Sequence, residues 1–143
     1  MRAHVAATTV GASAVGFARR ALAEAIAYAR SRHQFGRAIA EFQGIQFKLA
    51  EMAAELEASR LLVYQAAAAH DREPDSGIKS SIAKLFATEA AQRIVDQALQ
   101  VHGGIGVVAG HIMERLYRDV RALRIYEGTS EIQKLLIARE LLK

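Results

Sequence analysis

Hydrophobic residues recur at helical spacing along most of the chain. Between about residues 4 and 31 they step by three and four positions, at Val15, Ala18, Leu22, Ile26 and Ala29. A second segment, about 43–71, has a stripe with acidic Glu51 and Glu55 on its opposite side, and the stripe consists of Ile45, Leu49, Met52 and Leu56. Because side chains three and four apart share one face of an α-helix, both segments are predicted to be long helices with a buried stripe.

Glycine and proline residues separate further helical segments. Gly36 marks a loop over residues 33–42, and the run 74–77, which begins with Pro74, breaks the chain and offers a cap for a third helix. The run 100–106 contains three glycines; because it follows a helix rather than a strand, a helix-terminating turn is favoured over a dinucleotide-binding loop. The last three helices are expected to extend to about Val101, over about 112–120 and over about 130–142.

These elements predict an all-α fold, an up-and-down four-helix bundle with a short extra C-terminal helix, in a single domain over residues 1–143. The length suits one domain with a real core, and 52% hydrophobic with 24% charged residues is typical of globular proteins. The small-residue run 3–18 is interpreted as a closely packed helix face rather than a signal peptide, and it is too weakly apolar to span a bilayer. Gly11 and Gly16 lie within the first helix, where a neighbouring backbone is expected to come close.

Composition and charge limit the kinds of ligand and partner molecule that the chain is expected to bind. The absence of cysteine excludes disulfides and thiolate sites, and it fits a cytoplasmic location. A net charge of +4 leaves a polyanion partner open, and arginines recur every three residues at positions 115, 118, 121 and 124. Because Glu114 and Asp119 interrupt this row, a solvated or subunit-facing surface is favoured and no nucleic-acid partner is expected. No Glu-x-x-His pair occurs, so no metal site is expected, and His70 and His102 are predicted to be surface or loop residues.

Glu127 has the most distinctive local context among the carboxylates. Apolar Ile125 and Tyr126 precede it, and Gly128 follows it just before a helix expected to start near Thr129. Partial desolvation between apolar neighbours would raise the pKa of this carboxyl group and make it a stronger base. Gly128 lets the backbone approach a ligand, and free amides at the helix start can face a carbonyl or anionic oxygen. Local chemistry alone slightly favours an ordinary helix-capping acid over a catalytic base and leaves both open.

Three motifs follow one another along the chain. They are RHQFG at 32–36 with FQGIQ at 42–46, QVHGGIG at 100–106, and IYEGTSEIQ at 125–133. In order and separation they resemble the C-terminal helical domain of acyl-CoA dehydrogenases, over essentially the whole chain. The resemblance implies FAD as cofactor and the α,β-dehydrogenation of an acyl-CoA thioester as the reaction.

The same resemblance implies a role for each matching residue. Glu127 would remove the α-proton while the β-hydrogen leaves as hydride to FAD, and its backbone amide would polarise the thioester carbonyl. Gly128 would lie against the substrate, and Arg139 is a looser candidate near the CoA moiety. Thr129 and Glu131 would contact the FAD of their own subunit. The FAD of a neighbouring subunit would be approached by Arg32, Phe35, Gln43, Gln100, Gly103 and Gly104.

The resemblance also implies partners and an incomplete site. A homo-oligomer, either a dimer or a tetramer, is expected, with electron-transfer flavoprotein as a further partner if the chain is part of a complete enzyme. Family members carry an N-terminal helical domain and a middle β-domain, which are absent from these residues, so a separate β-domain chain is one expectation. Some relatives take their base from the first helix of this domain, but residues 5–9 offer no carboxylate and no arginine for CoA. The alternative is a non-catalytic oligomerisation or subunit-docking helical module.

Overall fold

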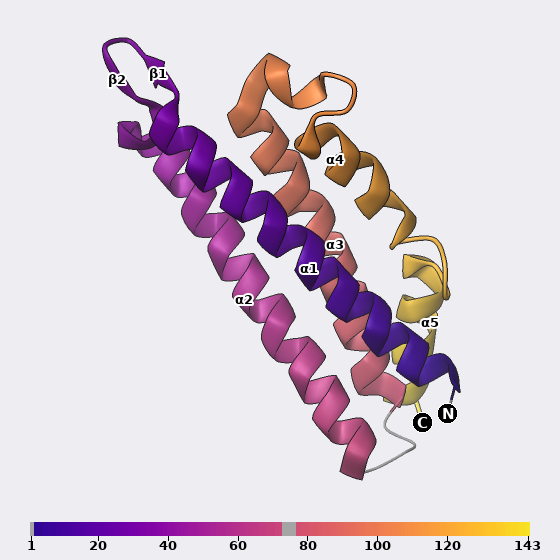
Figure 1. Ribbon diagram of the computed structural model, residues 1–143. Coiled ribbons are helices and arrows are strands. Elements are labelled where there is room, and N and C mark those ends of the chain that lie inside the picture. Colours follow the sequence, from indigo (N-terminus) through magenta and orange to yellow (C-terminus); the bar gives the residue numbers. More distant parts are fainter. Residues whose placement is uncertain (1, 73–76) are drawn as a thin grey trace.

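Five α-helices and one small hairpin make up the part of the chain described by the structure, a computed structural model covering residues 2–72 and 77–143 (Figure 1). The helices are α1 (Arg2–Ser31), α2 (Gln43–Arg72), α3 (Gly77–His102), α4 (Ile112–Ala122) and α5 (Ser130–Leu141). Their bounds agree with the hydrophobic spacing to within a few residues, and the predicted all-α bundle is confirmed. The break predicted at residues 74–76 lies outside the described residues.

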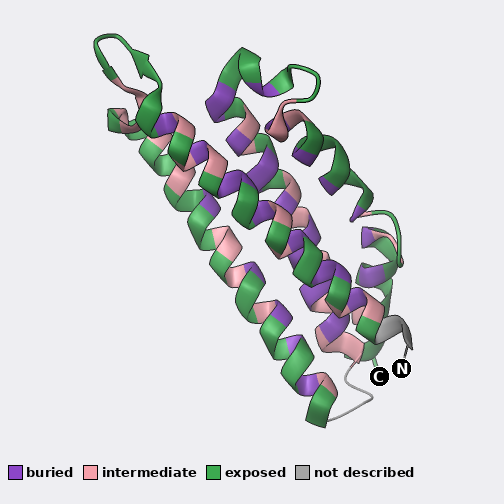
Figure 2. Cartoon of the chain, viewed as in Figure 1, coloured by how far each residue is buried: buried purple, intermediate pink, exposed green. Residues whose placement is uncertain are grey.

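Helix α3 is the centre of the bundle, because it contacts each of the other four helices. Figure 2 shows the buried residues concentrated along α1 and α3, whereas α2 presents a largely exposed outer face. Much of the buried surface between α1 and α3 comes from alanines, among them Ala14, Ala18, Ala21 and Ala25 on α1 and Ala83, Ala87 and Ala91 on α3. Such small side chains let two helices approach closely, as predicted for the small-residue run 3–18 of the first helix.

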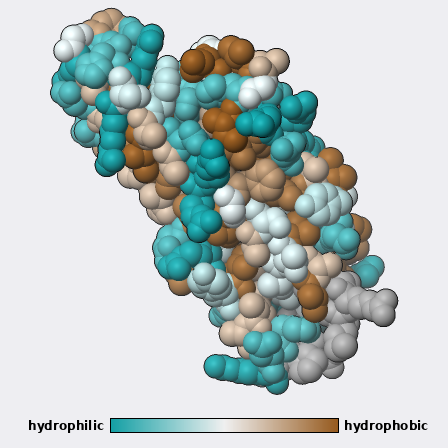
Figure 3. Space-filling view, in the orientation of Figure 1, coloured by the Kyte–Doolittle hydropathy of each residue, from teal (hydrophilic) through white to brown (hydrophobic). Residues whose placement is uncertain are grey.

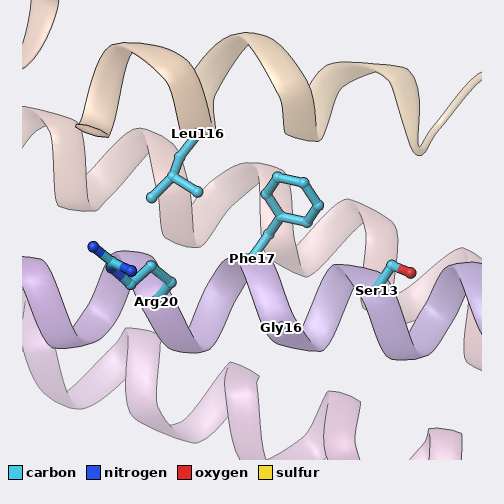
Figure 4. Close-up of a pocket in the computed structure, with 5 residues that line it drawn as sticks. All are labelled: Ser13, Gly16, Phe17, Arg20 and Leu116. Atoms are coloured by element: carbon cyan, nitrogen blue, oxygen red, sulfur yellow. The ribbon is translucent and has the colours of Figure 1, made fainter. Parts of the chain in front are cut away.

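The two glycines of α1 behave differently. A Cβ atom on Gly11 would lie 3.1 Å from Val63 Cγ2 and 3.6 Å from the Ala83 carbonyl oxygen, so the predicted close approach is confirmed there. A Cβ atom on Gly16 would meet nothing within 4 Å, so the same prediction is wrong at that position. The exposed Gly16 instead lines a groove of about 380 Å³ between α1 and α4, with Ser13, Phe17, Arg20 and Leu116 (Figure 4).

Two connections are more regular than the loops expected from the sequence. Between α1 and α2, the strands β1 (His33–Gln34) and β2 (Arg37–Ala38) pair antiparallel, and the 3-10 helix η1 (Ile39–Glu41) follows. After α3, the predicted turn is a second 3-10 helix, η2 (Gly103–Val107). None of the described helices is long and apolar enough to cross a membrane.

Candidate active site

Glu127 lies in the connection between α4 and α5, in an unusual backbone conformation. Its φ is +53°, and that of the following Gly128 is +86°. A non-glycine residue in the left-handed region costs of order 1–3 kcal/mol, and such strain persists only where the surroundings hold it. The contacts that hold this loop in its strained conformation are therefore part of the site.

Two buried side chains bind the backbone on both sides of Glu127. Lys84, on α3, is 1% exposed, and its ammonium donates hydrogen bonds to the carbonyl oxygens of Tyr126, at 3.0 Å, and of Gly128. Gln133, on α5, donates from Nε2 to the carbonyl oxygens of Glu127, at 3.3 Å, and of Gly128, at 3.2 Å. Three successive carbonyls are thus held by Lys84 and Gln133, which we call the carbonyl clamp.

Glu89, on α3, ties together the two ends of the same loop. Its Oε1 atom accepts hydrogen bonds from Arg124 Nε at 2.9 Å and from the Ser130 hydroxyl at 2.6 Å. Burial of Glu89 opposes its ionisation, but the hydrogen bonds from Ser130 and Arg124 outweigh this effect and hold the pKa of Glu89 below its ordinary value. The loop is therefore fixed at its ends by an ionised carboxylate and at its middle by the carbonyl clamp.

The start of α5 is capped by Thr129, whose hydroxyl accepts a hydrogen bond from the Ile132 amide at 3.4 Å. The interpretation of Glu127 as a helix-capping acid is therefore wrong, because a threonine fills that position. Glu131 lies in the first turn, where hydrogen bonds from its own amide and from Thr129 lower the pKa of its carboxyl group. The carboxylate of Glu127, in contrast, makes no hydrogen bond with any residue that the structure describes.

Glu127 lines a hollow of about 300 Å³ formed by three helices. The other lining residues are Ala7 from α1, Ser81 from α3, the adjacent Gly128, and Ile132, Gln133 and Leu136 from α5. Glu127 is the ionisable side chain within this lining, which is otherwise small, amide or apolar. Its apolar neighbours Ile125 and Tyr126 are 54% and 44% exposed, and Glu127 is itself exposed. The desolvation predicted from its sequence context is therefore not present in this chain.

The six residues predicted to approach a neighbouring subunit's FAD lie at the other end of the bundle. Figure 1 shows the hairpin and η2 at the top of the view, while α5 lies near the bottom. Ring stacking of Tyr28 on His102, with centroids 4.5 Å apart, joins the ends of α1 and α3 there. Along α3 alone, the distance from Lys84 to Gln100 is about 24 Å at 1.5 Å per residue. This group of residues and Glu127 therefore belong to two separate sites at opposite ends of the bundle.

The chemistry of that group suits a diphosphate-bearing cofactor presented from outside the chain. Arg32, Gln43 and Gln100 offer exposed guanidinium and amide donors, and Phe35 is 92% exposed. A Cβ atom on Gly103 or Gly104 would meet nothing within 4 Å, so the backbone is open to a ligand. Figure 3 shows hydrophobic side chains gathered over η2, where Ile105, Val107 and Val108 are exposed. The residues present fit one side of an FAD site.

Other predicted residues have different positions. Arg139 is exposed near the end of α5, about 15 Å along the helix from Thr129, so the structure does not bring it to Glu127. His102 is buried, with its Nδ1 atom 2.7 Å from the Ala98 carbonyl oxygen, so the prediction of a surface or loop residue is wrong. Among the described residues, no three His, Cys, Asp or Glu side chains gather as they would around a metal ion.

The row of arginines on and after α4 is partly paired with acids. Arg118 lies 3.1 Å from Glu114, and Arg124 lies 2.9 Å from Glu89. Arg124 therefore belongs to the clamped loop rather than to a free basic surface. Sequence reasoning missed this pairing, because Glu89 precedes Arg124 by 35 residues.

Comparison with known proteins finds relatives over nearly the whole chain. The family model described as acyl-CoA dehydrogenase, C-terminal domain, matches residues 2–142. A 3-(aryl)acrylate reductase of Clostridium sporogenes is 53% identical over 134 residues, covering 94% of this chain and 36% of that protein. The structure of butyryl-CoA dehydrogenase from Megasphaera elsdenii matches with a TM-score of 0.96 at 38% identity, covering 99% of this chain and 37% of that one. An acyl-CoA dehydrogenase from Bacillus anthracis, complexed with FAD, matches with a TM-score of 0.89 at 34% identity, covering 98% and 27%. The chain thus spans little more than a third of the first two proteins.

Proposed function

We propose that this chain, which belongs to the acyl-CoA dehydrogenase family and matches its C-terminal domain, supplies the base of an α,β-dehydrogenation, Glu127. The observation that carries the proposal is the contrast between backbone and side chain at this residue. The backbone is held by buried donors on both sides, whereas the carboxylate makes no hydrogen bond within the described chain and belongs to a residue at the edge of the hollow. A base must be free to accept a proton and fixed in direction, and this arrangement provides both.

The residues around the hollow suit an acyl-CoA thioester. The Glu127 carboxylate would accept the α-proton, and the backbone amide of Glu127 would donate a hydrogen bond to the thioester carbonyl, where negative charge develops. Ile132 and Leu136 give the hollow an apolar wall against which an acyl chain can pack. Bound FAD supplies the acceptor for the β-hydrogen, which leaves as hydride. If the enzyme worked in the opposite direction, as the name of the Clostridium relative indicates for that protein, Glu127 would return a proton to the α-carbon.

The cofactor would be held at two places on the chain. Thr129 and Glu131, at the start of α5, are proposed to contact the FAD that serves Glu127. Arg32, Phe35, Gln43, Gln100, Gly103 and Gly104 are proposed to contact the FAD of a second subunit, which requires at least a dimer. Because neither group of residues encloses a cofactor, we expect the 143 residues alone to bind FAD weakly. In the complete enzyme, electron-transfer flavoprotein is the proposed oxidant of the reduced FAD. Stoichiometric FAD on the purified chain, without any partner, would contradict this expectation.

Replacement of Glu127 by glutamine in the complete, FAD-loaded enzyme tests the assignment. Loss of a general base lowers turnover by about 10²- to 10⁴-fold, so kcat should fall by this factor while FAD content stays unchanged. Glu140→Gln is the matched control, because Glu140 lies at the far end of α5 and pairs with Lys143. Acyl-CoA turnover within tenfold of the parent enzyme in the Glu127→Gln variant would refute the proposal.

A second candidate function is a non-catalytic oligomerisation or docking module. It is favoured by the exposed apolar side chains of the C-terminal segment, Ile132, Leu135, Leu136, Leu141 and Leu142. A row of this kind commonly marks a protein interface. A sharp monomer at high concentration in analytical ultracentrifugation would count against it. Full activity of the Glu127→Gln variant would favour it over a catalytic role for this chain.

A further inference from the structure

Lys84 is a buried charged residue whose hydrogen-bond partners are backbone carbonyls rather than acids. It lies in the middle of α3 and is 1% exposed, among buried Ser80, Ser81 and Thr88. An ammonium inside a protein is costly unless hydrogen bonds replace its lost hydration. Here the replacement comes from the carbonyl oxygens of Tyr126 and Gly128, which belong to a loop more than forty residues further along the chain.

The two carbonyls that Lys84 holds are those on either side of Glu127. With φ positive at both Glu127 and Gly128, the loop turns so that both oxygens converge on one ammonium. The carboxylate of Glu127 forms no ion pair with Lys84 within 4.0 Å among the described residues, so the lysine binds the backbone and leaves the side chain unpaired. Burial lowers the pKa of Lys84, and the negative charge of Glu127 opposes this effect.

We propose that Lys84 is a positioning residue for Glu127, which fixes the orientation of this residue at the hollow by holding the backbone on both sides of it. The inference rests on the proposed function, because Glu127 must be the base for its direction to matter. A purely structural role would require only that the volume be filled, and methionine, an unbranched side chain of similar length, would fill it. Methionine has no donor for the two carbonyls, so the two roles predict different behaviour.

The test uses the complete, FAD-loaded enzyme with three substitutions. Lys84→Met removes all donors, Lys84→Gln retains an amide donor within reach of one carbonyl, and Lys48→Met is the matched control. Lys48 also bridges two helices, since its ammonium donates to Gln97 at 2.6 Å, but it lies far from Glu127 in the sequence and lines none of its hollow. A misplacement of about 1 Å can cost about 100-fold in rate.

Turnover and loop protection are the two readouts. We expect kcat to fall by about 10- to 100-fold in Lys84→Met, with a smaller loss in Lys84→Gln and less than a twofold change in Lys48→Met. The KM for acyl-CoA and the FAD content should stay within about threefold of the parent values, because the Lys84 side chain does not itself line the hollow and is not among the residues proposed to contact FAD. Amide hydrogen exchange in the segment 123–130 should accelerate in Lys84→Met and stay unchanged in Lys48→Met.

Several results would overturn the positioning role. One is a Lys84→Met enzyme with unchanged kcat and unchanged exchange in 123–130; another is a kcat that follows thermal stability rather than the number of donors. Failure of both Lys84 variants to accumulate as folded holoenzyme would assign the residue a purely structural role. Glu127→Gln in the same assay separates the two proposals: if it abolishes turnover while Lys84→Met does not, the base stands and the positioning role fails. If Glu127→Gln retains turnover, the proposed function itself fails.

Discussion

Replacement of Gly128 by alanine tests the carbonyl clamp through protein stability. At φ +86° an alanine would be strained, and its Cβ atom would lie 2.8 Å from Gln133 Nε2 and 3.4 Å from Ile132 Cγ2. Gln133 is 3% exposed, so its amide group has little room to withdraw. If it withdraws, the hydrogen bonds from Nε2 to the carbonyls of Glu127 and Gly128 are lost.

The expected magnitude follows from these two effects. A left-handed conformation costs an L-residue about 1–2 kcal/mol. Each lost hydrogen bond contributes about 0.5–1.5 kcal/mol, and the lower end applies here, because both distances exceed 3.1 Å. Gly128→Ala should therefore lower the free energy of unfolding by about 2–3 kcal/mol.

Gly16→Ala is the matched control, since it makes the same chemical change at a helical glycine. Gly16 is exposed within α1, and no atom lies within 4 Å of the added Cβ. Alanine in a helix interior is about 0.5–1 kcal/mol more favourable than glycine, so this variant should be more stable than the parent. Urea unfolding followed by circular dichroism measures both variants. A Gly128→Ala variant as stable as Gly16→Ala would refute the strain and the contact with Gln133.

Three further predictions concern stability. Hydrogen bonds outweigh burial and lower the pKa of Glu89, so its ionised form stabilises the folded state at neutral pH. This contribution should be lost as the pH falls below about 4.3. In Glu89→Gln, the urea concentration at the unfolding midpoint should therefore fall less steeply as the pH is lowered. Met52→Ala should cost about 2–5 kcal/mol in urea unfolding, because Met52 is 2% exposed, whereas Leu61→Ala, at a 56% exposed position, should change little. Glu127→Gln should stay within about 0.5 kcal/mol of the parent in the same experiment.

The hydrophobic spacing located the helices because each long helix buries one face, but it did not show how deeply. In the stripe of α2, Met52 is buried while Ile45 and Leu49 are only half-buried, since α2 lies at the side of the bundle. The hairpin was missed for a different reason. Its turn places Phe35 and Gly36 at φ +53° and +81°, a geometry that usually selects Asn-Gly or Asp-Gly, and phenylalanine gives no such signal.

In the candidate site, too, some residues could be recognised from the sequence and others could not. Glu127 was recognisable because its neighbours form a continuous motif, and Thr129 stands directly before the observed start of α5. Lys84 gave no comparable signal, because a lysine in a helix is ordinarily exposed and its partners lie 42 and 44 residues away. The one available hint was its position four residues from both Ser80 and Thr88, on the buried face of α3.

The conformation of Glu127 itself bears on whether its side chain serves the fold. At φ +53° glycine would carry no steric penalty, and a glutamate there costs of order 1–3 kcal/mol. Within the described chain this cost is not offset by the side chain, since the cap of α5 is Thr129 and the tie between the loop ends is Glu89. Lys84 and Gln133 hold only backbone carbonyls, which glycine would present equally well. A carboxylate that the fold does not need, on a strained backbone at the edge of a hollow, therefore supports the proposal that Glu127 acts on a molecule bound there.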